Sequence, residues 1–540
     1  MAEGTGSDSG SQTIGRRTVG EWAFQAERAY PAPYADVHLD AVFTAPSGRQ
    51  ATVPAFYDGG STWRVRFNPD EEGRWRYRTV ARLPDPGLER EGAFEVVPNE
   101  SPGFVTATPG EGWGFAREGG EPVMVFGDTV YHLFGFAHCG IDVEPFLRRR
   151  TEQGFNLLRV RLPVSPFHPP AGYSHWQTCR TWPWGGSEQA PRFDQINTDY
   201  FRTVDEVVRT ADGLGLGLEL IMEGWGFEFP FNSRQIFLPE WEELWMRYLI
   251  ARYDAFPSTW FWTPLNEYEY YPNGDWNYRP EADRWQLRVS RWIKAHAPHG
   301  HPVAAHNGPR LPPFAERFAS DPAAVDLILF QEWGDRSEEG GWLASGIEES
   351  IDAALAGWPG SAVLAEWGYE RNPAFDLNLP HHEHCDRDHT RRGAWRGAFR
   401  ALGIIHGFEN SWGPWAKLDE DQPGMADLLL VRRFFHEIAP FAGLRPAPDA
   451  ISGGEMGVGE RPQALATPVR DLIAVYLPVG GEVVVNGGAA TREARWFDPR
   501  TGDLQPAEGS TAGDGRRFAA PGGGGERPWD WMLVCGAAPG

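Results

Sequence analysis

The sequence predicts a fold of the α/β class, a (β/α)8 TIM barrel flanked by two small all-β sandwich domains. In the middle of the chain, eight apolar segments alternate with amphipathic stretches of helical length, which is the pattern of a closed parallel barrel. Before and after this region, short segments alternate polar with aromatic or β-branched residues, as sandwich strands do. The 540 residues also exceed one ordinary domain, so we expect three.

The N-terminal region divides into a tail and a sandwich. Residues 1–17 are polar and rich in Gly and Ser, which predicts a disordered tail. Residues 18–100 contain strand-like segments separated by the turn sequences SGRQ, GGS and DEEG, and the segment NPDEEGRWRY is the clearest hairpin. A β-sandwich is therefore expected there.

Residues 103–443 are expected to form the barrel. A doubly wound open sheet is the alternative, but it would need a Gly-rich phosphate loop after an early strand. The sequence contains neither G-x-G-x-x-G nor a P-loop motif, so we favour the barrel and predict no cofactor. The predicted strands span residues 122–128, 155–163, 216–223, 259–267, 302–307, 326–333, 361–367 and 404–412.

The last segment, residues 446–540, returns to short strands such as LIAVYLPV, EVVVN and WDWMLVC. Glycine-rich turns separate these strands, including GGGG at 522–525. This pattern predicts a second small β-sandwich.

The charge and cysteine content exclude several classes of partner. Lys and Arg number 50 against 74 Asp and Glu, a net charge of −24, which disfavours nucleic acid and anionic lipid as partners. No apolar run of 18 residues and no secretion signal are present, so we expect no membrane partner and a cytoplasmic protein. The four cysteines form no C-x-x-C pair and indicate neither a zinc site nor a disulfide scaffold. The oligomeric state is left open.

Polar and aromatic residues occupy most of the predicted strand ends. In barrel enzymes the active site lies at the carboxyl ends of the strands, so these residues are expected on one rim. Solvation or a salt bridge explains any one of them, whereas convergence of several favours a binding site. The residues predicted to line it are Asp128, Arg159, Glu223, Asn266, Glu267, His306, Gln331, Trp333, Glu366, Trp367 and Trp412.

Two of these strand ends supply the residues that we expect to catalyse a reaction. TPLNE places Glu267 at the end of strand 4, and VLAEW places Glu366 at the end of strand 7, on the opposite side of the ring. Glycoside hydrolysis requires such a pair, because one carboxyl protonates the leaving oxygen while the other attacks the sugar carbon or activates water. We therefore predict Glu267 and Glu366 as the catalytic residues.

This arrangement resembles the clan A retaining glycoside hydrolases, in which Asn-Glu follows strand 4 and a second Glu follows strand 7. The resemblance implies that Glu267 is the general acid/base, that Asn266 holds the sugar 2-hydroxyl, and that Glu366 is the nucleophile. The segment GFNLLRV resembles the strand 2 segment of the clan, which implies that Arg159 supports the nucleophile.

Within the clan, VFGDTVYHLFG resembles the strand 1 motif of the apiosidase-like barrels. RVRFNPDEEGRWRYRT is similar to a β-sandwich of unknown function that precedes such barrels. ARWFDPRTG and the closing DWMLV are similar to a collagen-binding-like β-domain that follows them. The resemblance covers nearly the whole chain from about residue 18, and the three-domain order is more specific than the carboxylate pair.

The sequence departs from the clan at two positions. Many members carry Tyr or His on strand 6 next to the nucleophile, where this chain has Gln331 in FQEW. The run EWGYE adds a second acid, Glu370, which the apiosidase-like motif also has and which rivals Glu366 for a role at the site. We favour Glu366 because it is closer to the strand end.

These features predict a retaining glycoside hydrolase that acts on oligosaccharides or glycosides. Long segments after strand 2 (164–197) and strand 7 (368–387) favour a closed pocket and exo action. The resemblance suggests a furanoside, or a fragment of a plant or microbial polysaccharide, as substrate. The alternatives are a polysaccharide lyase or transglycosylase using the same carboxylates, and a non-catalytic carbohydrate-binding protein.

The tryptophans and one histidine cluster complete the prediction. The chain has 25 Trp, and Trp at strand ends suits the apolar faces of sugars, so Trp333, Trp367 and Trp412 are expected as substrate contacts. The run HHEHCDRDH at 381–389 is dense in potential ligands but lacks two separated pairs. We therefore predict a loop there and no metal site.

Overall fold

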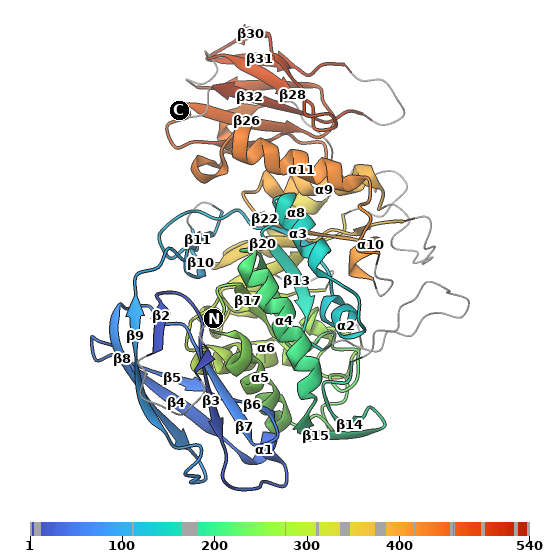
Figure 1. Ribbon diagram of the computed structural model, residues 1–540. Helices are drawn as coiled ribbons and strands as arrows, with labels where there is room; N and C mark the ends of the chain where they lie inside the picture. The colour runs from blue at the N-terminus through green and yellow to red at the C-terminus, as the bar shows by residue number, and fades with distance from the viewer. Residues whose placement is uncertain are drawn as a thin grey trace.

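The protein folds into a central barrel between two β-sandwiches, as Figure 1 shows. The N-terminal sandwich packs against one side of the barrel, and the C-terminal sandwich lies over α9 and α11 at the other end. In the described residues, no helix is both long and apolar enough to cross a membrane. The computed structural model describes residues 3–4, 12–110, 113–163, 181–275, 277–308, 313–334, 346–372, 385–413, 417–453, 457, 459–487, 492–522 and 528–536.

Eight parallel strands form the barrel, which confirms the predicted fold class. They are hydrogen-bonded in the order β17-β16-β13-β12-β22-β20-β19-β18. The bridge between Trp262 and Val303 closes the ring, with the Trp262 N–H donating to the Pro302 carbonyl at 3.0 Å. The strands are β12 (Phe126–Thr129), β13 (Leu157–Arg161), β16 (Gly217–Ile221), β17 (Thr259–Thr263), β18 (Ala304–His306), β19 (Leu327–Gln331), β20 (Ser361–Glu366) and β22 (Gly403–Phe408).

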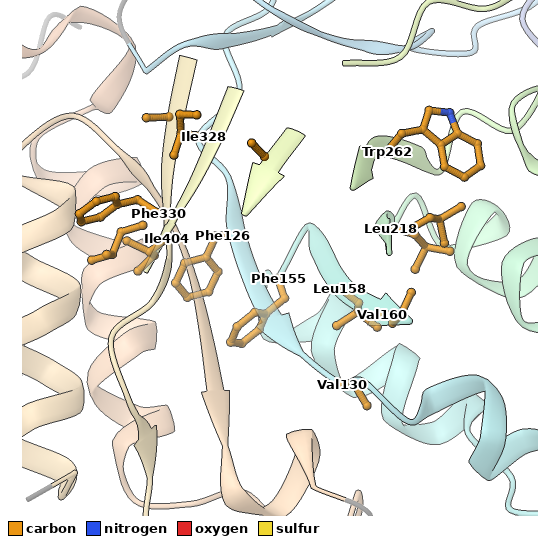
Figure 2. Packing of buried hydrophobic residues seen from close by; sticks show 14 of the residues in the cluster. Phe126, Val130, Phe155, Leu158, Val160, Leu218, Trp262, Ile328, Phe330 and Ile404 are labelled. Atoms are coloured by element: carbon orange, nitrogen blue, oxygen red, sulfur yellow. The ribbon is translucent and has the colours of Figure 1, made fainter. Parts of the chain in front are cut away.

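The strands are apolar throughout because both of their faces are buried. On β19, Leu327 and Leu329 belong to the cluster that fills the barrel, whereas Ile328 and Phe330 pack outward under the helices. Figure 2 shows part of this outer layer, where the rings of Phe126 and Phe155 lie 4.4 Å apart. A continuous hydrophobic run therefore indicates a barrel strand without telling which residues face inward.

Helices surround the strands, and their starts follow the expected local chemistry. Before α4, the Asn197 side chain accepts a hydrogen bond from the Tyr200 N–H, whereas α5 and α6 begin with Pro239 and Pro280. The helices are α2 (Leu133–His138), α3 (Glu144–Glu152), α4 (Thr198–Gly213), α5 (Pro239–Tyr253), α6 (Pro280–His296), α7 (Phe314–Arg317), α8 (Ile347–Ala354), α9 (Arg387–Ala398), α10 (Glu409–Trp412) and α11 (Gly424–Arg433). Short strands accompany them: β10 (Val105–Ala107), β11 (Phe115–Arg117), β14 (Trp184–Ser187), β15 (Ala190–Ile196) and β21 (Tyr369–Glu370).

The N-terminal sandwich has an aromatic core in which Trp22, Phe43 and Phe94 are in mutual contact. The prediction of a disordered tail through residue 17 is wrong for residues 12–15, because Ile14 is buried in this core and the segment pairs with β9. The elements are β1 (Glu3–Gly4), β2 (Gln12–Gly15), β3 (Gly20–Gln25), α1 (Pro33–Asp36), β4 (Leu39–Thr44), β5 (Gln50–Pro54), β6 (Phe56–Gly59), β7 (Thr62–Phe67), β8 (Gly73–Ala81) and β9 (Glu91–Val97).

The C-terminal sandwich is fixed to the barrel by buried contacts with α9. Arg391 of α9 forms an ion pair with Asp530 at 3.0 Å, and Trp395 stacks on Tyr476. The strands are β23 (Arg445–Pro446), β24 (Ile451–Ser452), β25 (Gln463–Ala466), β26 (Leu472–Leu477), β27 (Glu482–Asn486), β28 (Ala494–Phe497), β29 (Leu504–Pro506), β30 (Gly509–Ala512), β31 (Gly515–Ala519) and β32 (Trp531–Gly536).

A buried ion-pair network joins the N-terminal sandwich to the barrel. Asp205 of α4 accepts hydrogen bonds from Arg66 of β7 and from Arg252 of α5, and all three side chains are almost fully buried. The two guanidinium groups hold the pKa of Asp205 well below its usual value, although burial alone would raise it. The carboxylate therefore stabilises the docked arrangement at neutral pH and loses this effect as the pH falls towards strongly acid values.

We expect Asp205→Asn to destabilise the protein by about 3–5 kcal/mol, because the substitution leaves two buried guanidinium groups without their shared carboxylate. The measurement is thermal unfolding at pH 7, in which the midpoint should fall by several degrees. Asp199→Asn is a matched control, since Asp199 lies on the same helix and its side chain is 82% exposed. Equal midpoints for the two variants would contradict the prediction.

Candidate active site

Two carboxylates, predicted as the catalytic pair, meet at the carboxyl ends of the barrel strands. Glu366 ends β20 and Glu267 follows β17, and the side chains are almost buried, with 5% and 8% of their residue surfaces exposed. The Gln331 Nε2 donates a hydrogen bond of 2.6 Å to Glu366 Oε1. The amide on β19 therefore holds one oxygen of the Glu366 carboxylate.

A β-bulge turns Glu366 into the barrel. In the pairing of β19 with β20, Phe330 is opposite Leu364 and Gln331 is opposite Glu366, so Ala365 is an extra residue. Val363 and Ala365 both pack inside the barrel. With regular alternation the next residue would face outward, and the inserted residue reverses this, so Glu366 also faces inward.

The backbone at Glu267 has an uncommon conformation that brings its carboxyl to the same place. Glu267 has φ of 53°, in the left-handed region, which costs a non-glycine residue about 1–3 kcal/mol. Its N–H donates to His306 Nδ1 at 3.2 Å, so the ring proton of neutral His306 lies on Nε2, 3.8 Å from Glu366 Oε2. Burial and Arg159 hold the pKa of His306 well below its usual value, which keeps the ring neutral.

Arg159 is the cation of the site. It is fully buried, and its Nη1 donates to Glu366 Oε2 at 3.1 Å while its Nη2 donates to Asn266 Oδ1. Its Nε lies 3.6 Å from Glu219 Oε1. Burial raises the pKa of Glu219 to about 7, although Arg159 and Thr263 act in the opposite direction. The guanidinium thus connects the base of the barrel with Glu366.

Two tyrosines that the sequence did not single out complete the surroundings of Glu366. Tyr131 follows β12, and its hydroxyl lies 3.4 Å from Glu366 Oε2 and 3.0 Å from the hydroxyl of Tyr369 on β21. Tyr131 and Gln331 therefore contact Glu366 directly, and Tyr369 is connected to it through the Tyr131 hydroxyl. The segments VFGDTVYHLFG and EWGYE contain Tyr131 and Tyr369, and this position at strand ends was the sequence signal that could have identified them.

Aromatic rings surround these polar groups. Trp412 stacks on Tyr369 with centroids 4.8 Å apart, and Trp333 meets the same tyrosine edge-on. On the other side, Trp225 stacks on Phe227, which is 36% exposed. Such rings suit the apolar faces of sugars, and the placement of Trp333 and Trp412 agrees with their predicted role without testing it.

The carboxyl of Glu267 is the group whose protonation the surroundings alter most clearly. Burial and then the neighbouring Glu366 carboxylate hold the pKa of Glu267 well above its usual value. The nearby Gln331 amide and the charge of Arg159 lower it, while Glu269 raises it further. A carboxyl that keeps its proton near neutral pH is suited to act as a general acid.

We expect Glu267→Gln to raise the thermal stability at pH 7 to 8. The folded-state pKa lies above the unfolded value of about 4.3, so ionisation destabilises the fold increasingly as the pH rises from that value towards the folded-state pKa. Gln keeps the same backbone strain, so the difference reports the charge alone. Unfolding midpoints of both proteins should differ above about pH 5 and converge near pH 4. A difference that does not depend on pH would contradict this.

Four predicted residues lie apart from the pair. Asp128 forms a buried ion pair with Arg150, and the buried Glu223 forms one with the partly exposed Arg234. Trp367 is completely buried on the outer face of β20, where it packs against His406. Each of these three side chains is engaged in the protein interior, and their predicted role as substrate contacts stays a prediction.

Glu370 is the fourth residue that lies apart. Its position argues against Glu370 taking the place of Glu366 at the site. Its Oε1 accepts a hydrogen bond of 3.0 Å from the Gly424 N–H at the start of α11. Burial raises its pKa to about 7. The carboxyl therefore caps the N-terminus of α11.

The described residues hold no group of three or more His, Cys, Asp or Glu placed to bind a metal ion. Residues 381–384 of the histidine-rich run lie outside the described residues, so that part of the run is not tested. Of its described members, Cys385 is buried, and His389 Nε2 is hydrogen-bonded to the Trp367 carbonyl at 2.7 Å.

Comparison with known structures supports the fold. A "putative glycoside hydrolase" from Bacteroides vulgatus superposes with a TM-score of 0.68 at 17% identity, covering 97% of this chain and 100% of that one. A glycoside hydrolase family 5 protein from the same organism gives a TM-score of 0.59 at 17% identity, covering 80% and 93%. At this identity the likeness concerns the fold alone. A search of curated protein sequences found no significant match.

Family models match three successive parts of the chain. The model of a "domain of unknown function (DUF5060)" matches residues 17–82, and that of a "putative collagen-binding domain of a collagenase" matches residues 446–536. The model described as "Apiosidase-like, catalytic domain" matches residues 111–432, which is more than half of the 540 residues. The chain therefore belongs to the apiosidase-like family.

Proposed function

We propose that the protein is a retaining glycoside hydrolase in which Glu366 is the nucleophile and Glu267 the general acid/base. The family and the fold support glycosidase activity. The observation that carries the finer assignment is the difference between the two carboxyls. Glu366 accepts hydrogen bonds from Arg159 and Gln331, whereas burial and the Glu366 charge hold the pKa of Glu267 well above its usual value.

The reaction follows from this difference in two steps. In the first, a Glu366 oxygen attacks the anomeric carbon, the bond to the leaving group breaks, and Glu267 transfers its proton to the departing oxygen. In the second, Glu267 accepts a proton from water as the water oxygen displaces Glu366 from the sugar. Each group returns to its starting protonation state, and two inversions give net retention.

The substrate class is proposed from the rim and the family. Aromatic rings of Trp225, Tyr369 and Trp412 beside the carboxylates support a carbohydrate, and the family description supports furanosides such as apiosyl or arabinofuranosyl units. Exo action on oligosaccharides and a cytoplasmic location remain proposals. The segments on which exo action depends, 164–197 and 368–387, lie partly outside the described residues.

A panel of aryl glycosides, covering common pyranosides and furanosides, tests the proposal. We expect release of the phenol from at least one furanoside and no release by Glu366→Gln prepared in the same way. Products that absorb in the ultraviolet through a new C=C bond would instead identify a lyase. Sugar binding without turnover by the wild-type protein, unaffected by Glu267→Gln, would identify a binding protein.

A further inference from the structure

A cavity of about 510 Å³ lies between the N-terminal sandwich and the barrel. The sandwich contributes β2 and residues 17–20 to its lining, and β11 contributes Arg117. The barrel contributes the end of α4 and the segments that lead into β16 and β17. The cavity is therefore at the amino ends of the barrel strands, whereas Glu267 and Glu366 lie at the carboxyl ends. Its volume is within the range of small-molecule sites.

Unfilled space and apolar side chains give the cavity its shape. Gly213 ends α4 and Gly215 precedes β16, and a Cβ atom at either position would meet no heavy atom from another part of the described chain within 4 Å. Phe256, Pro257 and Trp260 form part of the apolar lining. A ligand with a hydrophobic face would therefore find both room and apolar contacts here.

The charged side chains around the cavity are mostly cationic, in a chain whose net charge is −24. They are Arg17, Arg117, Arg209 and Asp212. Arg17 is matched by Glu118 at 2.5 Å. Asp212 is the one acid among the described lining residues, and its Oδ1 accepts a hydrogen bond of 3.0 Å from the Ser258 N–H. The charge balance at the cavity therefore depends on the two remaining arginines.

Arg117 is a half-buried cation without a counter-ion among the described residues. Its Nη1 donates to the Gly103 carbonyl at 3.4 Å, and the described carboxylates form no ion pair with it. Its guanidinium carbon lies 5.6 Å from the centre of the Trp260 ring. Burial lowers the pKa of Arg117, while the charge of Glu121 acts in the opposite direction. An anion beside this guanidinium would stabilise its charged form.

Arg209 is only partly compensated. Its Nη2 lies 3.2 Å from Glu21 Oε2, but its Nε is buried without a hydrogen-bond partner in the described structure. The same Glu21 carboxylate accepts hydrogen bonds of 2.7 Å from Arg64 and from Arg66. One carboxylate thus serves three guanidinium groups, which leaves N–H donors of Arg209 for a further acceptor.

We propose that this cavity binds a monosaccharide or disaccharide that carries one carboxylate group, such as a hexuronate. The carboxylate pairs with the planar guanidinium of Arg117, sugar hydroxyls donate to Asp212, and the C–H face of the ring packs on the apolar lining. One uncompensated arginine favours a single negative charge, and Asp212 repels a dianion such as inorganic phosphate. The site is independent of the roles of Glu267 and Glu366, which lie at the other end of the barrel.

A ligand in this cavity contacts the N-terminal sandwich and the barrel at the same time. Because it binds the folded protein, it stabilises the docked arrangement by mass action. The site thus gives the sandwich, which matches a domain of unknown function, a part in sugar binding.

Isothermal titration calorimetry on the full chain tests the proposal, with sodium glucuronate as the probe. Glucose is the matched neutral probe, because it has the same ring with a hydroxymethyl group in place of the carboxylate. Inorganic phosphate supplies charge without a ring. We expect saturable binding of glucuronate and at least about tenfold weaker binding of the other two at equal ionic strength. Glucuronate should also raise the thermal unfolding midpoint.

Two substitutions locate the binding. Arg117→Gln should weaken glucuronate binding about tenfold or more, because charge-assisted hydrogen bonds are lost. Gly213→Leu should abolish it, because the new side chain fills the open space at the end of α4. Arg74→Gln is the matched control and should bind like wild type, since Arg74 is exposed on β8 of the same sandwich. Unfolding midpoints without ligand check that each variant folds.

The inference is overturned if the wild-type protein shows no saturable binding of glucuronate, or binds glucose or phosphate as tightly. Binding that survives both Arg117→Gln and Gly213→Leu would place the sugar elsewhere, including the active rim, and would overturn it too. If Arg117→Gln does not fold, Arg117→Lys carries the same measurement, because it keeps the charge without the planar fork. The proposed function is tested separately, by turnover of the aryl glycosides.

Discussion

Glu366→Gln should lower kcat by on the order of 10⁴- to 10⁶-fold, as removal of a covalent nucleophile does in well-studied hydrolases. The amide is isosteric but cannot form the glycosyl–enzyme bond. Arg159 and Tyr131 can donate to the amide oxygen in place of Oε2. A flip of the Gln331 amide lets its own oxygen accept from the new NH2 in place of donating to Oε1, so the fold should survive. The measurement is the initial rate on an aryl glycoside, with the thermal midpoint as a check on folding.

Glu370→Gln is the matched control for this prediction. Glu370 is buried four residues further along the chain, but its carboxyl contacts the N-terminus of α11. We expect the Glu370→Gln enzyme to keep activity within about tenfold of wild type, because the substitution leaves both Glu267 and Glu366 in place. If Glu370→Gln were inactive and Glu366→Gln active, the nucleophile would have to be reassigned.

Arg159→Met should lower kcat at least about 100-fold and destabilise the protein by about 3–5 kcal/mol. Arg159 is fully buried between Glu366, Asn266 and Glu219, and methionine leaves two carboxyls in the interior without their cation. Glu219, whose pKa burial already raises to about 7, should then take up a proton near neutral pH. Kinetics on the aryl glycoside and thermal unfolding measure the two effects separately.

Glu219→Gln distinguishes the effect of Arg159 on Glu366 from the effect of Arg159 on the stability of the fold. It removes the deeper partner of Arg159 and leaves the contact of 3.1 Å between Arg159 and Glu366. We expect near-normal kcat from this variant, and partial recovery of stability when it is combined with Arg159→Met. A loss of kcat equal to that of Arg159→Met would mean that Arg159 acts through the network and not on Glu366 directly.

The barrel and the position of its carboxylates were predictable because their signals are local. Eight apolar segments alternating with amphipathic ones require a parallel sheet covered on both faces, and a carboxylate at the end of such a strand lies on the active rim. Glu267 and Glu366 are therefore found from the segments TPLNE and VLAEW. The β-sandwiches follow equally from turns between short alternating segments.

The details that decide the site were not predictable because they depend on register. Strands buried on both faces give no alternation, so nothing in SAVLAEW reveals that Ala365 is an inserted residue which turns Glu366 inward and Trp367 outward. The hydroxyl of Tyr131 reaches Glu366 from a strand 235 residues earlier in the chain. The ion pair of Asp128 with Arg150 was likewise not predictable, because Arg150 lies on a helix 22 residues further along the chain.

The stereochemistry of hydrolysis tests the central claim most directly. Proton NMR spectra of the best aryl glycoside, recorded during hydrolysis and before the product mutarotates, identify the anomer that forms first. Two successive displacements through Glu366 predict a first product with the anomeric configuration of the substrate. A first product of opposite configuration would mean that water attacks the sugar directly, and would contradict the assignment of Glu366 as nucleophile.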